Sequence, residues 1–252
     1  MEHSGKHALV TGGGTGIGAS IAVGLANAGA QVTITGRRAA PLDKLATTHD
    51  NIHACVMDVC DEASVRDGIN AAASVHGPVQ ICVANAGIAE GGPFADIKLA
   101  DWRRMMATNL DGVFLTLQSA MATLPADLPA RMIVISSIAG LRGLNRATPY
   151  TASKHGVIGL IRGLSEEFKR SPITFNAICP GYVDTDIVRK QLPGLMRRMN
   201  TDEAGAAAVF AKGNRHDTLL SPDEITSAAL WLCSDGARSV NGQTIEIAGG
   251  QV

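Results

Sequence analysis

The sequence predicts an α/β fold, a doubly wound seven-stranded parallel sheet with helices on both faces. Short apolar runs that suit strands recur along the whole chain, and helix-like segments separate them. Strands buried on both faces are apolar throughout, and strands that alternate with helices form a parallel sheet. Since no Pro- or Ser-rich linker divides the chain, residues 1–252 are expected to form a single domain.

Each element of this fold has its own signal. The expected strands are 7–11, 31–35, 52–57, 79–84, 131–136, 173–179 and 244–248. After the first strand, Ile17, Ile21 and Leu25 recur at helical spacing, and Gly29 ends that helix. The clearest further helices are expected at 62–76, 99–121, 149–170 and 222–233. Between about 186 and 220, charged residues, Gly and Met interrupt the periodicity, which predicts a mobile flap.

Composition excludes several classes of function. The net charge of −1 argues against a nucleic-acid partner held by bulk electrostatics. No apolar run is long enough to span a bilayer and the first residues are not a signal peptide, so we expect a cytoplasmic protein without a membrane partner. The cysteines are odd in number and lack CxxC spacing, which predicts reduced, buried thiols and no metal site: Cys55, Cys60, Cys82, Cys179 and Cys233.

A glycine-rich stretch, "TGGGTGIG" at 11–18, lies between the first strand and the first helix. Glycines there let the backbone approach a ligand closely, and the start of the helix offers N–H groups and a positive dipole end to a phosphate. The alternative is a tight turn that only packs the helix on the sheet. In this strand–turn–helix context we favour a dinucleotide site.

A second constellation surrounds residues 137–154. Tyr150 and Lys154 are four apart at the start of an expected helix, where Thr148 is expected to cap it, so they share one face. An ammonium nearby favours the phenolate and lowers the tyrosine pKa, which suits proton exchange with an alcohol or ketone. Ser137 follows a strand, and such strand ends form the sites of open α/β sheets. The alternatives are a solvated helix face and an N-capping hydroxyl.

Taken together, these motifs resemble those of the short-chain dehydrogenase/reductase family over essentially the whole chain. The matching motifs are "TGGGTGIG", "ANAG" at 84–87, "NLDGVF" at 109–114, Ser137, "YTASK" at 150–154 and "PGYVDT" at 180–185. Ala84 departs from the usual Asn of that family, at a position that supports the backbone. The resemblance implies a Rossmann-like fold and an NAD(P)-dependent oxidoreductase that interconverts a secondary alcohol and a ketone.

The resemblance also implies roles for individual residues. The catalytic set would be Asn109, Ser137, Tyr150 and Lys154, in which Ser137 orients the substrate oxygen and Tyr150 exchanges its proton. Lys154 would lower the tyrosine pKa and bind ribose hydroxyls, while Asn109 would hold a helix kink and a water. Nothing in this set is missing, which argues against a non-catalytic dinucleotide sensor, the alternative from another class. A nucleotide-sugar epimerase is disfavoured by the short chain.

For the cofactor, the resemblance places Asp58 at the adenine amino group and Thr185 at the nicotinamide carboxamide. The full cofactor-binding set is Gly12, Thr15, Gly16, Ile17, Gly18, Arg37, Arg38, Asp58, Val59, Asn85, Gly87, Tyr150, Lys154, Pro180, Gly181, Val183 and Thr185.

Cofactor choice is expected to depend on the end of the second strand. An acidic residue there would bind the ribose 2′-hydroxyl, but this chain has Gly36 followed by Arg37 and Arg38. Two guanidinium groups suit a 2′-phosphate, although they would also suit a solvated turn. Thr15 counts against NADP, because many NADP-preferring relatives have a basic residue there. NADP(H) is therefore favoured over NAD(H), and NAD(H) stays open.

The substrate pocket is expected between 87–94, 138–145 and the flap. Leu141, Leu144, Tyr182, Leu192, Met196 and Met199 would form its apolar wall. Arg189, Lys190, Arg197, Arg198, Lys212 and Arg215 are either a solvated surface or a site for an anionic substrate, such as a carboxylate or an acyl thioester. The flap start is similar to that of 3-hydroxyacyl dehydrogenases, which suggests a 3-oxoacyl or 3-hydroxyacyl substrate.

A homotetramer is expected as well, because the family pairs its two long helices across a twofold axis. The apolar residues taken as surplus on these helices are Met105, Met106, Val113, Leu117, Met121, Val157, Ile158, Leu160, Ile161 and Leu164.

Overall fold

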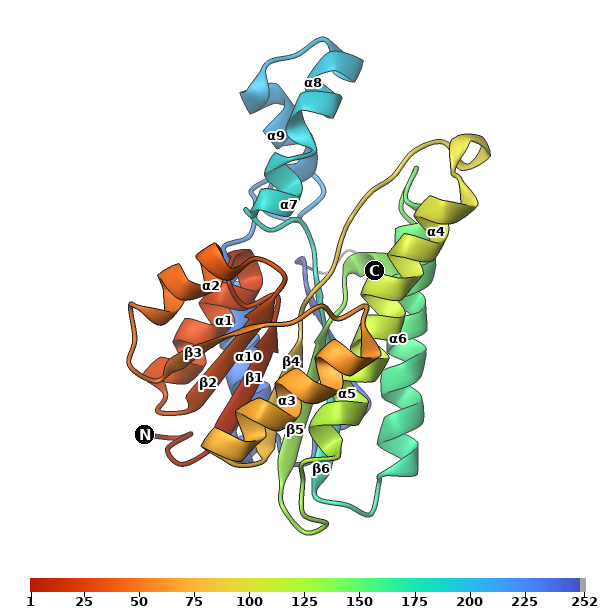
Figure 1. Cartoon of the computed structure of the whole chain (residues 1–252). Coiled ribbons are helices and arrows are strands. Elements are labelled where there is room, and N and C mark those ends of the chain that lie inside the picture. The colour runs from red at the N-terminus through yellow and green to blue at the C-terminus, as the bar shows by residue number, and fades with distance from the viewer. Residues whose placement is uncertain (250–252) are drawn as a thin grey trace.

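The computed structural model describes residues 1–249, so the last three residues of the expected domain lie outside the described part (Figure 1). It contains one parallel sheet of seven strands in the order β3-β2-β1-β4-β5-β6-β7, with helices on both sides. The predicted fold class is confirmed. The strands are β1 (His7–Thr11), β2 (Gln31–Gly36), β3 (Ile52–Val56), β4 (Val79–Ala84), β5 (Ala130–Ile135), β6 (Ile173–Pro180) and β7 (Thr244–Ile247).

The strand order reverses at β1, which pairs with β2 on one side and β4 on the other. The chain therefore leaves the carboxyl ends of β1 and β4 in opposite directions, and this opens a crevice between them. In open α/β sheets, ligands bind at such a point.

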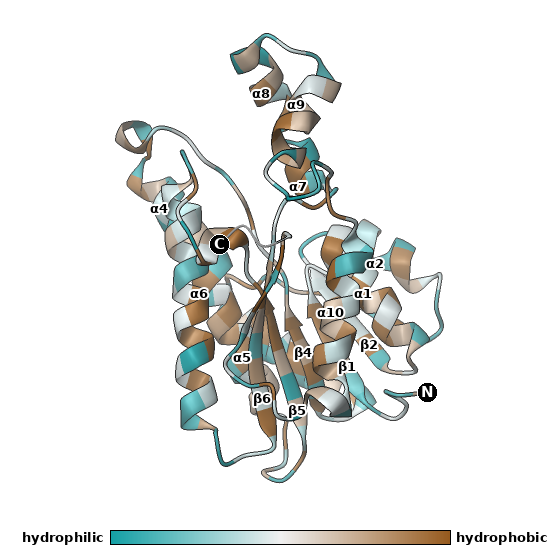
Figure 2. Cartoon of the chain, turned by 180° about the vertical axis from the view of Figure 1, so that it is seen from behind, coloured by the Kyte–Doolittle hydropathy of each residue, from teal (hydrophilic) through white to brown (hydrophobic). Residues whose placement is uncertain are grey.

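Two apolar layers hold the helices on the sheet. Neighbouring strand residues point to opposite faces, so Val10 belongs to one layer and Leu9 to the other. One face packs against α1 (Gly16–Asn27), α2 (Ala39–Ala46) and α10 (Pro222–Cys233). The opposite face packs against α3 (Glu62–His76), α5 (Gly112–Met121) and α6 (Thr148–Glu167). Figure 2 shows the hydrophobic strands enclosed between these helices.

The helix expected at 99–121 is interrupted. It consists of α4 (Leu99–Met106), a π-helical turn (Ala107–Asp111) and α5. The amide of Asn109 is buried within this turn and forms two hydrogen bonds with the backbone of Ile88, in the loop after β4. Such π turns occur often at functional sites.

The start of α6 also differs from the expectation. The residue before the helix is Ala147, and no side chain caps it, so Thr148 lies inside the first turn instead of capping it. Pro149 is in the first turn, as expected.

The flap contains three short helices, α7 (Asp186–Arg189), α8 (Leu192–Met199) and α9 (Glu203–Ala211), which stand beyond the carboxyl ends of the strands (Figure 1). Leu192 and Leu195 are buried against Ala206, and Met196 packs on them. Leu192 and Met196 were expected in the substrate wall, but they contribute to this separate apolar cluster, because the apolar face of α8 packs on the alanine-rich α9.

Most residues that were taken as surplus on the long helices are part of the core of this chain. Met105, Val113, Leu117, Val157 and Ile161 are each at most 3% exposed. They therefore do not indicate a subunit interface.

Within the described residues, all five cysteines are free thiols, and Cys82, Cys179 and Cys233 are buried. Cys60 is exposed, contrary to the expectation that the thiols are buried. No described helix combines the length and the hydropathy needed to cross a membrane.

Candidate active site

The glycine turn connects β1 to α1 with a backbone that only glycine adopts easily. Gly12 and Gly16 have φ of +63° and +55°, in the left-handed region. A Cβ on Gly18 would lie 2.4 Å from the carbonyl oxygen of Gly12, so the helix can approach the turn only because residue 18 has no side chain. Thr15 makes no side-chain hydrogen bond to α1, and the first turn holds no acidic residue. The start of this helix therefore suits a phosphate.

Asn85 fixes the glycine turn to the end of β4. Its Nδ2 donates to the carbonyl oxygen of Thr11 at 2.9 Å, and its backbone N–H donates to Thr11 Oγ1 at 3.0 Å. The N–H of Ala86 donates to the same hydroxyl at 3.0 Å. Thr11 and Asn85 thus join the carboxyl ends of β1 and β4, the point at which the strand order reverses.

A cavity of about 220 Å³ opens beside this turn. Predicted cofactor residues along it are Gly12, Thr15, Arg37, Arg38, Asp58, Val59 and Gly87. Its glycine floor and exposed arginines fit one end of a dinucleotide. Two more predicted residues lie near the turn: α1 begins with Gly16, and Thr185 Cγ2 would lie 3.2 Å from a Cβ on that glycine.

Asp58 is held in place by its own loop. Its Oδ1 accepts the N–H of Cys60 at 3.0 Å, and its backbone N–H donates to Ser64 Oγ at 3.1 Å. The carboxylate therefore faces the cavity with a fixed orientation.

Ser137, Tyr150 and Lys154 come together beyond the end of β5. Ser137 is 8% exposed, and its side chain lies close to the Tyr150 side chain. The Nζ of Lys154 lies 5.7 Å from the centre of the Tyr150 ring and donates to the carbonyl oxygen of Ile135 at 2.8 Å. Ser137 Oγ also accepts the N–H of Ala139 at 3.1 Å, so the capping alternative holds alongside the contact with Tyr150.

The pKa of Tyr150 departs from the expectation. Burial raises it, and the hydrogen bond with Ser137 opposes that rise. Burial also lowers the pKa of Lys154 to about 8. We expected the ammonium to lower the tyrosine pKa, but desolvation dominates for both groups.

Asn109 connects this set to the loop after β4. Its Oδ1 accepts the N–H of Ile88 and its Nδ2 donates to the Ile88 carbonyl, both at 2.9 Å. Its Nδ2 also lies 3.2 Å from Ser153 Oγ on α6. A Cβ on Gly87 would lie 3.3 Å from Asn109 Oδ1 and 3.8 Å from Lys154 Nζ. The expected helix irregularity at Asn109 is present, and the residue lies beside Lys154.

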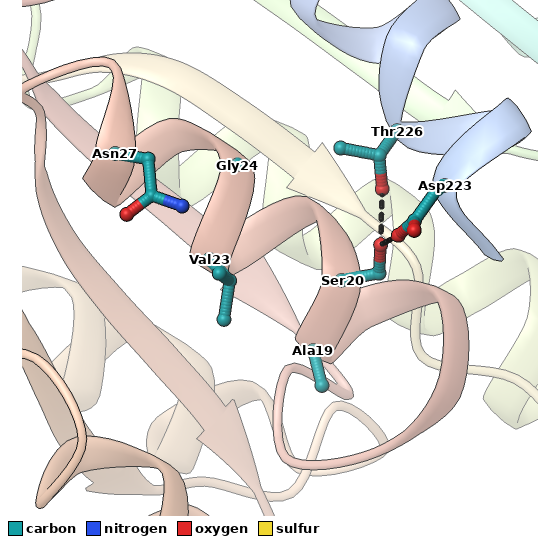
Figure 3. A pocket seen from close by; sticks show the side chains of 7 residues that line it. All are labelled: Ala19, Ser20, Val23, Gly24, Asn27, Asp223 and Thr226. Atoms are coloured by element: carbon teal, nitrogen blue, oxygen red, sulfur yellow. Dashed lines mark hydrogen bonds between the residues drawn. The ribbon is translucent and has the colours of Figure 1, made fainter.

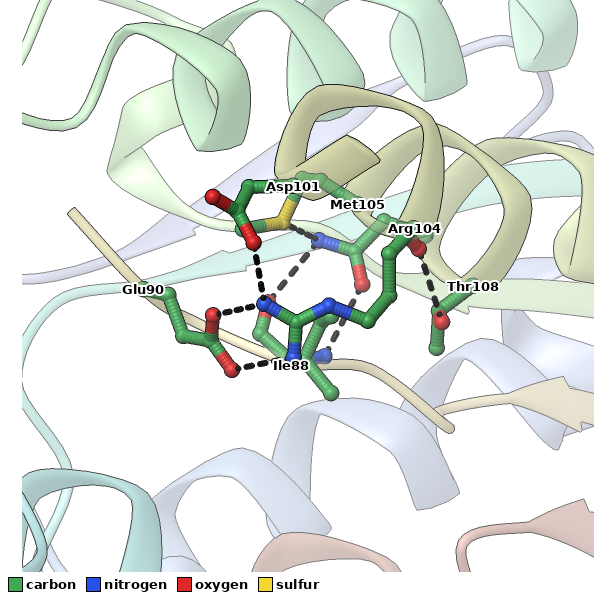
Figure 4. A network of polar contacts seen from close by, with 7 residues as sticks. Ile88, Glu90, Asp101, Arg104, Met105 and Thr108 are labelled. Atoms are coloured by element: carbon green, nitrogen blue, oxygen red, sulfur yellow. Dashed lines mark hydrogen bonds and ion pairs between the residues drawn. The ribbon is translucent and has the colours of Figure 1, made fainter. Parts of the chain in front are cut away.

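A polar network on α4 holds the same loop from outside (Figure 4). Arg104 makes a two-pronged ion pair with Glu90, with nitrogen–oxygen distances of 3.0 and 2.5 Å, and it also contacts Asp101 at 3.1 Å. In an α-helix, residues five apart lie about 140° apart around the axis. The wider π turn reduces this angle, so Arg104 and Asn109 both reach the loop.

A larger cavity of about 450 Å³ lies between α1 and α10, away from these residues (Figure 3). There Ser20 Oγ donates to Asp223 at 2.8 Å and contacts Thr226 Oγ1 at 2.6 Å. No predicted site residue lines it, so we assign the site to the smaller cavity and the set around Tyr150.

Comparison with known proteins agrees with this geometry. A family model described as short chain dehydrogenase matches residues 6–195. The chain belongs to the short-chain dehydrogenases. The chain is an NAD(P)-dependent oxidoreductase that acts on carbonyl or alcohol groups.

Curated relatives of this short-chain dehydrogenase match it over almost their full length. D-beta-hydroxybutyrate dehydrogenase of Rhizobium meliloti is 32% identical, covering 97% of this chain and 98% of that protein. The 3-oxoacyl-(acyl-carrier-protein) reductase of Aquifex aeolicus is 30% identical, covering 99% and 98%. Among solved structures, a variant of actinorhodin polyketide ketoreductase with NADPH has a TM-score of 0.93 at 29% identity, covering 97% of this chain and 96% of that one.

Several residues that shape the site of this short-chain dehydrogenase were not found from the sequence. Thr11 begins the glycine motif, but its hydroxyl accepts N–H groups of the two residues that follow β4, and the sequence does not show that β4 lies beside β1. No sequence pattern indicated that Glu90 and Arg104 form an ion pair. Ile88 acts through its backbone alone, and no sequence signal reports such a contact.

Proposed function

We propose that this enzyme interconverts a ketone and a secondary alcohol, with a 3-oxoacyl or 3-hydroxyacyl compound as substrate and Tyr150 as the acid and base. The observation that carries the proposal is that Ser137, Tyr150 and Lys154 come together beyond β5, with Ser137 beside the Tyr150 side chain and Lys154 Nζ 5.7 Å from the centre of the ring. The two relatives named for 3-oxoacyl and hydroxybutyrate substrates support the substrate class.

The residues would divide the chemistry among them. Ser137 donates a hydrogen bond to the substrate oxygen, and Tyr150 delivers or removes the proton at that oxygen. Lys154 places a positive charge beside the ring, and Asn109 fixes the loop that ends the substrate pocket. A bound dinucleotide would supply the hydride to the ketone or accept it from the alcohol, since no side chain can do either. Gly12, Gly16, Ile17 and Gly18 would hold its phosphates, and Asn85 would support the turn from behind.

The activity is tested with a panel of ketones and secondary alcohols offered with NADPH and NADH, followed by nicotinamide absorbance. Turnover of 3-oxoacyl thioesters or 3-oxo acids above simple ketones supports the proposal. Cofactor binding without turnover of any compound would instead favour the non-catalytic sensor.

We further propose that NADP(H) is preferred over NAD(H). Arg37 and Arg38 are exposed at the rim of the cofactor cavity, where a 2′-phosphate would lie. A Cβ on Gly36 would meet only Leu42, at 3.8 Å, so the missing carboxylate at this position is not a consequence of lack of space.

The variant Gly36→Asp combined with Arg37→Ala and Arg38→Ala should reverse this preference. Each charge-assisted hydrogen bond contributes about 1.5–3 kcal/mol, so the KM for NADPH should rise at least about tenfold while that for NADH stays equal or falls. Steady-state kinetics with both cofactors measure the change, and Arg238→Ala serves as a control that removes a distant exposed arginine. Equal effects on both cofactors would contradict the preference.

The rate should also depend on the protonation of Lys154. Its pKa is lowered to about 8 by burial, so the ammonium is present below that pH and is lost as the pH rises through it. The value of kcat/KM for the cofactor reports groups of the free enzyme, and we expect it to fall above about pH 8. A flat profile up to pH 9.5, with the fold intact by circular dichroism, would contradict this role.

We propose a cytoplasmic homotetramer formed from single-domain subunits with the flap at about 186–220. Phe114 on α5 is 45% exposed and gives that helix an apolar surface. Light scattering at micromolar concentration should give four times the mass of the chain, and a monomeric mass would contradict it.

An anionic substrate group is a second proposal for the flap. Arg197 and Arg198 are exposed at the end of α8, whereas Arg189 is paired with Asp184 at 3.0 and 3.1 Å. The basic group that could attract an acyl thioester is therefore smaller than the sequence suggested.

A further inference from the structure

One buried amide joins the two ends of the flap. Asn214, three residues after α9, is 2% exposed. Its Oδ1 accepts the N–H of Tyr182 at 2.9 Å, and its Nδ2 donates to the carbonyl oxygens of Tyr182 and Thr218, both at 2.8 Å. The side chain thus satisfies both backbone groups of Tyr182, as a neighbouring strand would.

The surrounding contacts depend on this amide. A Cβ on Gly181 would lie 2.3 Å from Asn214 Oδ1, so the glycine leaves the space that the amide occupies. The Tyr182 ring lies 5.1 Å from that of Phe210, and Leu220 donates its N–H to the Tyr182 carbonyl at 2.9 Å. Asn214 is therefore at the centre of the neck through which the chain enters and leaves the flap.

The loop held in this way leads to the candidate site. It leaves β6 at Pro180 and reaches Thr185, which lies near the start of α1, since a Cβ on Gly16 would be 3.2 Å from Thr185 Cγ2. Tyr182 is also close enough to Tyr150 for their charges to interact. A displacement of the Tyr182 backbone would therefore move the segment between the glycine turn and the acid–base set.

We propose that Asn214 is a positioning residue for the nicotinamide half of the cofactor. It acts through the backbone of Tyr182 and holds loop 180–185 against the site. The inference rests on the proposed function, because it takes this loop as the one that contacts the nicotinamide. The adenosine half, which would lie along the cavity beside Arg37 and Asp58, has no contact with Asn214.

Removing the Asn214 amide should weaken binding of the nicotinamide half of the cofactor and leave binding of the adenosine half almost unchanged. In Asn214→Ala the N–H of Tyr182 loses its partner, and the loop should move to find another. We expect the Kd for NADPH to rise at least about tenfold, while the Kd for adenosine 2′,5′-bisphosphate, which lacks the nicotinamide, changes less than twofold. Titration calorimetry measures both.

A matched control comes from β6, the strand that leads into this loop. Asn176 is 1% exposed and also bonds two backbone groups, Val240 O at 2.8 Å and Gln243 N at 3.0 Å, but it lies in the first half of β6. Asn176→Ala should leave the ratio of the two Kd values unchanged. The positioning role would be overturned if the ratio changed equally in both variants. It would also be overturned if Asn214→Ala lost affinity equally for NADPH and for adenosine 2′,5′-bisphosphate.

Two further measurements keep the inference testable if Asn214→Ala does not fold. Asn214→Asp keeps the acceptor for Tyr182 and loses both donations, so it should weaken NADPH binding in the same selective way. In the wild-type protein, hydrogen exchange at the Tyr182–Asp184 amides should slow with NADPH but not with adenosine 2′,5′-bisphosphate. Equal slowing with both ligands would overturn the proposal. Absence of ketone turnover in a wild type that binds NADPH would count against the proposed activity alone.

Discussion

Replacement of Tyr150 by phenylalanine should lower kcat about 10²–10⁴-fold, the usual contribution of a positioned acid–base group. Only the hydroxyl beside Ser137 is lost, and the ring still fills its partly buried place on α6. The Kd for NADPH should therefore change less than about threefold. Single-turnover kinetics with saturating cofactor measure the chemical step directly.

The chain provides its own control for this variant, because its second tyrosine is Tyr182. Tyr182→Phe removes a hydroxyl from the neighbouring loop without touching the proposed proton path. Its kcat should stay within about fivefold of the wild type. If the two variants lose activity to a similar degree, the assignment of Tyr150 as the acid and base is wrong.

Gly18→Ala should have the second largest effect, because its Cβ would lie 2.4 Å from the Gly12 carbonyl oxygen and 2.5 Å from Asn85 Nδ2. Neither atom can move without breaking the contacts that join β1 and β4. Overpacking of this kind costs about 1–3 kcal/mol of unfolding free energy. A shift of about 1 Å in a binding group can cost about a hundredfold, so NADPH affinity should fall by roughly that factor.

Denaturant unfolding and cofactor titration check this result against Gly194→Ala. In α8 the added Cβ would meet nothing within 4 Å, and alanine favours a helix by up to about 1 kcal/mol over glycine. This variant should bind NADPH as the wild type does and unfold with an equal or larger free energy. Wild-type affinity in Gly18→Ala would show that the glycine turn does not hold the dinucleotide.

The sequence was most informative where a pattern repeats. The strands of the sheet and the long helices on it follow from apolar periodicity, and the glycine motif located the start of α1. A helix kink at Asn109 was expected from the resemblance, but its form as a π turn was not, because one extra residue per turn hardly changes a helical pattern. The helices of the flap were missed since Pro193 and Gly194 interrupt a short segment whose apolar residues serve a local cluster.

Other features depend on contacts that periodicity does not contain. The amide of Asn214 bonds to a residue 32 positions earlier, and no local signal marks that pair. The direction of the Tyr150 pKa shift depends on how deeply the ring is buried, which the spacing to Lys154 does not report. Likewise, Met105 and Val157 were taken as surface residues because a helical wheel does not show how wide the covered face is.

The separate apolar cluster of the flap has a consequence for how such enzymes diversify. Because Leu192, Leu195 and Ala206 pack on one another, α8 and α9 do not draw on the layers that hold the helices on the sheet. Mutations there can accumulate with little effect on the folding of the scaffold, and natural selection can change what is recognised while the parts that carry the hydride chemistry are inherited intact.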